Sequence, residues 1–201
     1  MTVSRPQAEY PRSWYVATAQ IPQRRQELTR DTSCDVCVIG GGLAGLTVAY
    51  ELARRGKSVV LVEANRIGWG ASGRNGGFVS AGFAEGLSKI IERVGLDEAK
   101  ALYGLSVEGL EYVRNTITGF DPTIRMGEGW LVAQRYPDAE SQRQLAALLN
   151  GAFGRRTKVL EPAETRRLLR SDRYFHSRFD PSAFHIHPLR YCLAVAAAAR
   201  Q

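Results

Sequence analysis

Histidine, cysteine and lysine are scarce in this 201-residue sequence, with 3 His, 3 Cys and only 4 lysines among 27 basic residues. Cys34 and Cys37 have the C-x-x-C spacing of a redox pair or half a zinc site. If both belong to one strand, however, they point to opposite faces and cannot share a ligand. His185 and His187 would share one face of an extended segment, but His176 is the one other histidine. We therefore expect structural thiols, a hydrogen-bonded histidine pair or a contact near a ligand, and no metal.

Long hydrophobic runs are also missing. The longest uncharged stretch, residues 36–50, contains four glycines and is too short to cross a bilayer. The first thirty residues contain five arginines and no apolar core of a secretory signal, so we expect a cytoplasmic protein without a membrane span. With 44% hydrophobic and 23% charged residues, the chain has the composition of a globular protein. Its net charge of +7 comes from scattered arginines, which favours a solvated basic surface over a nucleic-acid partner.

The most informative segment, residues 35–64, reads DVCVIGGGLAGLTVAYELARRGKSVVLVEA. Its apolar runs at 36–39 and 59–62 are typical of parallel strands that are buried on both faces. Between them lies a stretch with helical spacing of apolar residues, which ends near Gly56 at a typical helix C-cap. The segment therefore predicts one complete βαβ unit.

The turn after the first strand has the pattern G-x-G-x-x-G at Gly40, Gly42 and Gly45. The first glycine allows a tight turn, the second leaves room for a pyrophosphate, and the third lets the helix pack against the sheet. No Lys or Arg lies between Gly40 and Tyr50, so helix N–H groups would hold the phosphates. Glu63 follows Gly45 by eighteen residues, where a carboxylate binds a ribose and repels the 2′-phosphate of NADP.

This pattern predicts a dinucleotide site. The predicted cofactor-binding residues of the βαβ unit are Gly40, Gly42, Leu43, Ala44, Gly45 and Glu63. The alternative is a βαβ unit that keeps its packing without a ligand.

A glycine-rich segment, GWGASGRNGGFVSAG, follows at residues 68–82. It is either a flexible connector or a loop whose backbone approaches a ligand. The aromatic Trp69 and Phe78 and the charge of Arg74 weigh against the connector.

The remaining chain predicts helices mixed with antiparallel strands. Helices are expected at 85–94, from about 97, at 137–149, from 161 and at 189–200, with a strand at 157–160. Residues 123–134 are interpreted as a hairpin that turns at 127–129, and residues 176–188 as a strand and a turn. The second helix would bury an apolar stripe of Leu102, Leu105, Val113 and Ile117.

Three stretches resemble a known family: SWYVATA at 13–19, the segment from Cys34 to Gly77, and SDRYFHSRFDPSAFHIHPLRYCLAVAAAAR at 171–200. Together they resemble FAD-dependent amine oxidases of the D-amino-acid oxidase superfamily, above all the gamma-glutamylputrescine oxidases. GWGASGRNGG and HIHPL are the more specific parts of this likeness. The resemblance implies an N-terminal arm at 1–30, an FAD-binding βαβ unit and loop at 31–84, a substrate-domain portion at 85–187, and a returning helix at 188–201.

The resemblance also implies chemistry. FAD would be the cofactor, and its ribityl chain and flavin ring would lie along Ser72, Gly73, Asn75 and Gly76. Family members oxidise a small amine or amino acid by hydride transfer to the flavin, oxygen reoxidises the flavin, and the imine hydrolyses. Where many members have a polar residue after the Gly-Gly, this chain has Phe78. No catalytic acid or base is predicted, and Arg74 is interpreted either as a charge near the flavin or as structural.

The predicted fold class is α/β: a Rossmann-like FAD-binding βαβ unit with an inserted α+β substrate-domain portion. Family members are about twice as long as this chain, and a nucleotide-binding half usually has more than two parallel strands. We therefore expect an N-terminal half that needs a complementary C-terminal half for activity. The alternatives are a truncated, non-catalytic dinucleotide-binding remnant and an unrelated NAD-binding protein.

Overall fold

The computed structural model describes residues 9–200, which form two compact units. Unit 1 comprises the described residues up to Gly77, the segment Phe120–Ile124 and the residues from His187 on. Unit 2 comprises Phe78–Gly119 and Arg125–Ile186. The first eight residues of the expected N-terminal arm lie outside the described range.

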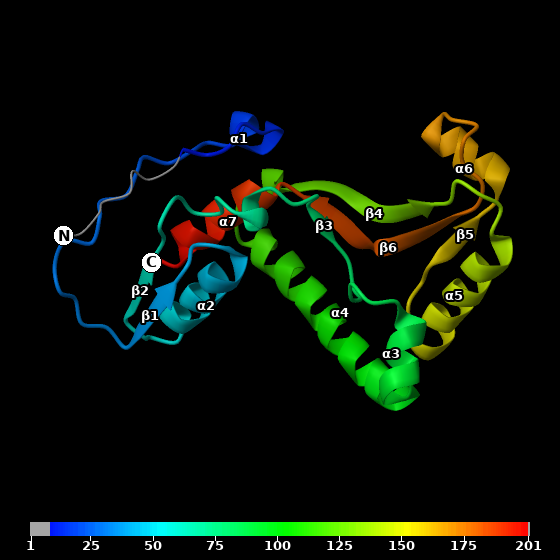
Figure 1. The fold of residues 1–201 in the computed structure, drawn as a ribbon, viewed down its shortest axis with the longest axis horizontal. Coiled ribbons are helices and arrows are strands. Elements are labelled where there is room, and N and C mark those ends of the chain that lie inside the picture. The colour runs from blue at the N-terminus through cyan, green and yellow to red at the C-terminus, as the bar shows by residue number, and fades with distance from the viewer. Residues whose placement is uncertain (1–8, 201) are drawn as a thin grey trace. The chain divides into compact units, whose positions relative to one another are not determined.

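Unit 1 contains the predicted βαβ arrangement (Figure 1). Strands β1 (Val36–Ile39) and β2 (Val59–Val62) pair in parallel, and α2 (Leu43–Arg54) connects them. Gly56, with φ +74°, follows α2 in the left-handed conformation that ends many helices. The other elements of the unit are α1 (Trp14–Thr18), the short 3₁₀ helices η1 (Ala71–Gly73) and η2 (Pro122–Ile124), and α7 (Pro188–Ala198).

The core of unit 1 lies between α2 and α7, which pack against each other. Leu46 and Ala49 of α2 are buried, as are Leu189, Cys192 and Val195 of α7. Helix α7 also packs against η1 and α1. These contacts join the glycine-rich loop and the aromatic segment near the N-terminus to the βαβ unit.

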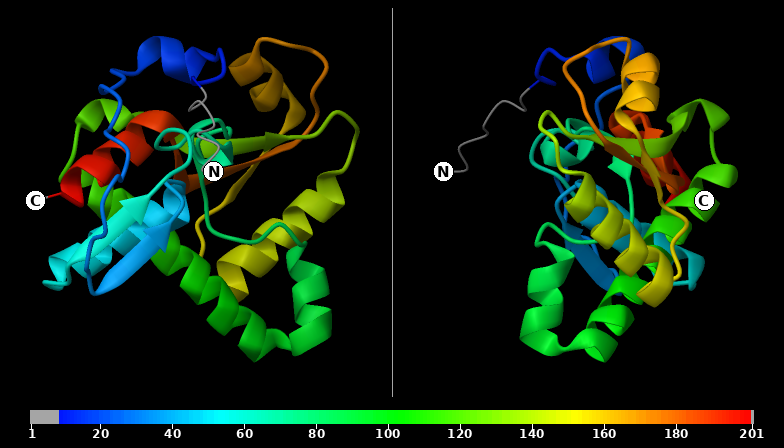
Figure 2. Two further views of the ribbon diagram at one scale, coloured as in Figure 1. Left: turned by 60° about the vertical axis from the view of Figure 1, so that its left-hand side comes forward. Right: turned by 90° about the vertical axis from the view of Figure 1, so that its right-hand side faces the viewer.

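Unit 2 contains an antiparallel sheet with helices (Figure 2). Its central strand β6 (Ser177–Ile186) pairs with β3 (Phe78–Val79), β4 (Arg125–Ala133) and β5 (Lys158–Leu160). Helices α3 (Leu87–Val94) and α4 (Leu96–Thr118) pack side by side, and α5 (Ala139–Ala152) contacts β5 and β6. Helix α6 (Pro162–Leu169) lies between β5 and β6 in the chain. The two units together have the predicted α/β fold class with an α+β insertion.

The predicted hairpin at 123–134 is wrong, because β4 is one continuous strand paired with β6. Its register shifts between Arg125 and Gly127 and between Glu128 and Trp130, so the Gly-Glu-Gly sequence forms bulges and not a turn. Gly129 has φ +73°, and a Cβ there would lie 2.2 Å from the ring of Phe179. Only glycine fits at this bulge.

The turn expected within 176–188 is also wrong. Strand β6 continues through Pro181, opposite the second register shift of β4. Proline cannot donate to a sheet ladder, so it is tolerated where the ladder is interrupted. Pro181 does mark an interruption of regular pairing, but the interruption is a bulge and not a turn.

The predicted apolar stripe of α4 is partly wrong. Ile117 is buried, but Leu102 and Leu105 are 38% and 61% exposed. The buried face instead carries Ala99, Tyr103, Leu110 and Ile117. The helix therefore packs through the face that carries Ala99 and Tyr103, and not through the face that carries Leu102 and Leu105.

Within the described residues, the first strand of unit 1 is not buried on both faces. Of its four residues only Val38 is buried, and Ile39 is 87% exposed. In the part of the chain that the structure describes, the parallel sheet has two strands, and α2 packs against them. None of the helices within residues 9–200 is both long and apolar enough to cross a membrane.

Candidate dinucleotide-binding site

The turn from β1 into α2 depends on two glycines for steric reasons. Gly40 has φ +107°, a conformation that side chains rarely adopt, and its N–H donates to the Val62 carbonyl at 2.8 Å. A Cβ on Gly45 would lie 2.1 Å from the carbonyl oxygen of Gly40. The first turn of α2 can therefore pack on the end of β1 only with glycine at position 45.

Glu63, directly after β2, holds this turn from the side. One carboxylate oxygen accepts from the N–H of Gly41 at 2.6 Å, and the other accepts from Asn65 at 2.8 Å. The carbonyl of Gly41 in turn accepts from the N–H of Gly68 at 2.8 Å. The backbone of one residue, Gly41, thus joins the β1–α2 turn to the end of β2 and to the glycine-rich loop. Because each carboxylate oxygen has a further lone pair, Glu63 can still accept a hydrogen bond from a ligand.

Ser72 of η1 acts as the side-chain cap that α2 otherwise lacks. The N-cap residue, Gly42, has no side chain, and the N–H of Leu43 donates to Ser72 Oγ at 2.9 Å. A Cβ on Gly42 would lie 3.2 Å from the same oxygen. The glycine-rich loop therefore lies directly against the start of α2.

The next two N–H groups of α2, those of Ala44 and Gly45, have no acceptor among the described residues. Ala44 is exposed, so these donors are open to a ligand. Free N–H groups and the helix dipole together form an anion site, which is how helix N-termini bind phosphates. The donors, the space at Gly42 and the carboxylate of Glu63 fit the adenosine diphosphate part of FAD.

The other residues predicted to contact the flavin lie on the same loop. Some of their polar groups already form hydrogen bonds within the loop. A Cβ on Gly73 would lie 2.2 Å from the Gly68 carbonyl, so this glycine allows the loop to close on itself. Asn75 donates to the carbonyls of Ala71 and Ser72 and accepts from the Gly77 N–H. Gly76 is exposed.

Arg74 stacks on the ring of Trp69, with 5.2 Å between the guanidinium carbon and the ring centroid. It also donates to the carbonyl of Gly70 at 3.3 Å. These contacts show a structural role for Arg74. Phe78 belongs to unit 2, where it stacks on Trp130 and contacts the ring of His185.

Sequence reasoning missed the contribution of residues near the N-terminus. The hydroxyl of Tyr10 donates to the Ile67 carbonyl at 2.6 Å, and the indole N–H of Trp69 donates to the Glu9 carbonyl at 2.9 Å. Burial raises the pKa of Tyr10, although the charge of Arg66 lowers it. Contacts across nearly sixty residues have no local sequence signal. The aromatic residues were the one available hint.

The histidines and cysteines form no shared site. His187 is the buried N-cap of α7, where its Nδ1 accepts from the Arg190 N–H and its Nε2 lies 3.0 Å from Thr18 Oγ1. His185 belongs to β6, and His187 follows the strand with extended backbone, but the ring of His187 packs against Trp14 and Tyr15 while that of His185 packs against Phe78. Cys34 precedes β1, and Cys37 is exposed. Within residues 9–200 there is no group of three His, Cys, Asp or Glu side chains that could hold a metal.

Cys192 is the buried thiol of α7. Burial raises its pKa to about 12, so it is protonated at neutral pH. Its side chain packs against Gly68, where a Cβ would lie 3.1 Å from Cys192 Cβ. Cys192 therefore packs α7 against the glycine-rich loop and is not a nucleophile.

Two related proteins are similar in sequence to this chain over most of its length. A probable oxidoreductase, OrdL, from Haemophilus influenzae is 34% identical over 197 residues, which cover 94% of this chain and 44% of the relative. The gamma-glutamylputrescine oxidoreductase of Escherichia coli is 35% identical over 198 residues, which cover 96% of this chain and 45% of the relative. The chain thus spans less than half the length of these relatives.

Solved structures share the fold. A glycine oxidase from Geobacillus kaustophilus superposes with a TM-score of 0.62 at 23% identity, covering 83% of this chain and 44% of that protein. The FAD-bound L-alpha-glycerophosphate oxidase from Mycoplasma pneumoniae superposes with a TM-score of 0.58 at 21% identity, covering 84% and 42%. The sequence model of the DAO family, described as FAD-dependent oxidoreductase, matches residues 35–201. With this match and with relatives above 30% identity over most of its length, the chain belongs to the DAO family of FAD-dependent oxidoreductases.

Proposed function

We propose that this chain supplies the FAD-binding portion of an enzyme that oxidises the C–N bond of a small amine or amino acid. The open N-terminus of α2 beside Glu63 is the observation that carries the proposal, because it fits the adenosine diphosphate of FAD. The substrate class is suggested by the names of relatives, which include a gamma-glutamylputrescine oxidoreductase and glycine oxidases.

Each part of the cradle has a separate task in this proposal. The N–H groups of Ala44 and Gly45 bind the pyrophosphate, and Gly42 lets it approach the backbone. Glu63 accepts from the adenosine ribose while it holds Gly41 in place. Gly73, Asn75 and Gly76 shape the loop along which the ribityl chain and the flavin ring lie. FAD held there would supply the redox chemistry of C–N oxidation, with oxygen as the electron acceptor, while these residues bind and orient it.

We also propose a complementary polypeptide that covers the parallel sheet of unit 1. Ile39 of β1 is 87% exposed, although its sequence context is that of a strand buried on both faces. A two-stranded sheet has little stability of its own and leaves its edges open to pairing. In relatives of about twice the length, the C-terminal part is the natural source of this cover.

Co-expression tests both proposals. The chain would be produced alone and together with the C-terminal part of the Escherichia coli gamma-glutamylputrescine oxidoreductase. We expect the visible absorption of bound FAD to be weak for the chain alone and much stronger for the pair. Only the pair is expected to release peroxide with gamma-glutamylputrescine or with members of an amine panel.

Each result of the co-expression bears on one of the proposals. Binding of NAD in place of FAD would contradict the cofactor assignment. Amine-dependent turnover by the chain alone would contradict the need for a complementary polypeptide. Bound FAD in the pair without turnover of any amine or amino acid would contradict the substrate class.

Glu63→Ala is expected to weaken FAD binding by about 1.5–3 kcal/mol, the range for hydrogen bonds to a charged group. The change removes the ribose acceptor and also frees the N–H groups of Gly41 and Asn65. Titration of flavin fluorescence measures the affinity in the co-expressed pair. Glu108→Ala, an exposed change of the same charge on α4, is the control. Equal affinity in Glu63→Ala and Glu108→Ala would refute the role of Glu63.

A further inference from the structure

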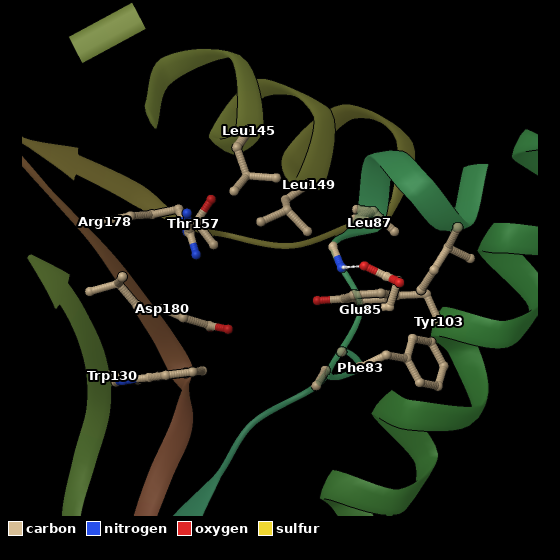
Figure 3. A pocket seen from close by; sticks show the side chains of 15 residues that line it. Phe83, Glu85, Leu87, Tyr103, Trp130, Leu145, Leu149, Thr157, Arg178 and Asp180 are labelled. Carbon is tan, nitrogen blue, oxygen red and sulfur yellow. Dashed lines mark hydrogen bonds between the residues drawn. The ribbon is translucent and has the colours of Figure 1, made fainter. Parts of the chain in front are cut away.

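A separate cavity lies wholly within unit 2 (Figure 3). Its volume is about 230 Å³. The apolar part of its wall includes Leu87 and Ile90 of α3, Trp130 of β4, and Leu145 and Leu149 of α5. Two charged side chains of β6, Arg178 and Asp180, also line it. The cavity is therefore lined by apolar side chains from α3 and α5, and by both apolar and charged side chains from the sheet.

Arg178 and Asp180 are two residues apart on one strand, so both side chains project from the same face of the sheet. In the register of the sheet they lie opposite Val132 and Trp130 of β4, which also line the cavity. The backbone of the sheet thus fixes both charges at the cavity wall (Figure 3).

The carboxylate of Asp180 already has three partners. One oxygen accepts from the N–H of Ser182 at 3.0 Å and from its hydroxyl at 2.5 Å, and the other lies 3.3 Å from Arg155. The side chains of Arg155 and Asp180 are only 8% and 15% exposed, so this ion pair is largely removed from water. Burial raises the pKa of Asp180, but the hydrogen bonds from Ser182 and the charge of Arg155 outweigh it and leave the pKa below its usual value.

Arg178, by contrast, has most of its hydrogen-bonding capacity unused. A guanidinium has five N–H donors, and that of Arg178 makes one long hydrogen bond, to Gln142 Oε1 at 3.4 Å. Burial lowers the pKa of Arg178, opposed by the charges of Asp180 and Tyr103. The buried Nε of Arg155 has no partner among the described residues. Arg155 pairs with the carboxylate of Asp180, whereas Arg178 has no ion pair among the described residues, which leaves its positive charge uncompensated at the cavity.

Glu85, the other acid in the cavity wall, does not supply the missing negative charge. Its carboxylate lies 3.5 Å from Lys89 and 3.6 Å from Arg93, and it accepts from the N–H of Gly86 at 3.2 Å. Its charge is thus balanced on α3 and in the adjoining loop, away from Arg178 (Figure 3).

We infer that this cavity binds a small monocarboxylate with a short apolar chain, whose carboxylate pairs with Arg178 and whose chain packs against Leu145, Leu149 and Trp130. A carboxylate matches the planar fork of a guanidinium and compensates the excess positive charge. The small volume admits only a few carbon atoms beyond the carboxylate. This site is independent of the proposed FAD-dependent function.

Calorimetric titration of the 201-residue chain with three ligands of equal chain length tests the inference. Butyrate is expected to bind, whereas butyramide and butylammonium are expected to bind at least about tenfold more weakly, because they lack the negative charge. Failure of butyrate to bind, or equal binding of butyramide, would overturn the inference.

Variants locate the binding. Arg178→Met is expected to weaken butyrate binding at least about tenfold, and Arg178→Lys by less, because lysine keeps the charge without the fork. Arg173→Met removes the same charge at an exposed position outside the cavity wall and is expected to leave the affinity unchanged. Leu145→Phe, which reduces the cavity from α5 and keeps Arg178, is expected to weaken binding as well. A dispersed amide NMR spectrum confirms that each variant is folded, and unchanged butyrate affinity in folded Arg178→Met would overturn the assignment.

Discussion

Gly45→Ala is expected to destabilise unit 1 by about 3 kcal/mol, at the upper end of the usual cost of overpacking a core. The added methyl carbon would lie 2.1 Å from the Gly40 carbonyl oxygen, and it would also come within 3.2 Å of Val38 Cγ1. Because the obstacle is backbone, no side-chain rotation relieves the clash. Helix α2 must then move away from β1, which also displaces the N–H groups of the anion site.

Hydrogen exchange of the α2 amides in increasing urea measures this loss, since it reports the opening of one element and not of the whole chain. Gly70→Ala is the matched control, because Gly70 has a negative φ and nothing within 4 Å of a built Cβ. We expect the control to keep the protection of α2. Equal protection in Gly45→Ala would mean that the tight contact between α2 and β1 is not required.

The βαβ unit was predictable because its signals are local. The alternation of apolar runs with Gly40, Gly42 and Gly45 falls within thirty residues, and each glycine corresponds to a steric requirement of one turn. The acid at position 63 ends the second strand in the structure, as its spacing predicted. The fold class followed from the same segment.

The errors arose where distant contacts decide the outcome. Gly127 and Gly129 have the composition of a turn, but a long partner strand, β6, holds them in bulges. Leu102 and Leu105 are more apolar than Ala99 and Tyr103, but the packing of unit 2 buries the latter pair. Local propensity is a weak guide wherever tertiary pairing competes with it.

The sequence indicated which residues form the candidate site, but not the hydrogen bonds that join them. Ser72 and Leu43 are 29 residues apart, and their hydrogen bond makes the loop a cap for α2. Gly41, the variable position of the motif, is the residue whose backbone N–H and carbonyl bind Glu63 and Gly68. No local sequence pattern predicts either of these long-range hydrogen bonds. That these residues contact FAD remains a prediction.

Gly42→Val separates binding from folding, in contrast to the change at Gly45. Gly42 has φ −80° and ψ 177°, a backbone conformation that valine adopts readily. A built Cβ would meet only Ser72 Oγ, at 3.2 Å, so the βαβ unit should tolerate the side chain with a small adjustment of Ser72. The branched side chain would nevertheless occupy the space through which a pyrophosphate reaches the backbone.

We expect Gly42→Val to lower FAD affinity at least about 1,000-fold, or roughly 4 kcal/mol, and therefore more than Glu63→Ala does. Flavin fluorescence titration measures the affinity, and hydrogen exchange of α2 shows whether the helix is still folded. The expected pattern is lost FAD binding with retained α2 protection in Gly42→Val, against loss of both in Gly45→Ala. If Gly42→Val binds FAD normally, the phosphates do not lie at the start of α2. In that case the N–H groups of Ala44 and Gly45 do not bind the FAD phosphates, and the start of α2 is not an anion site for the dinucleotide.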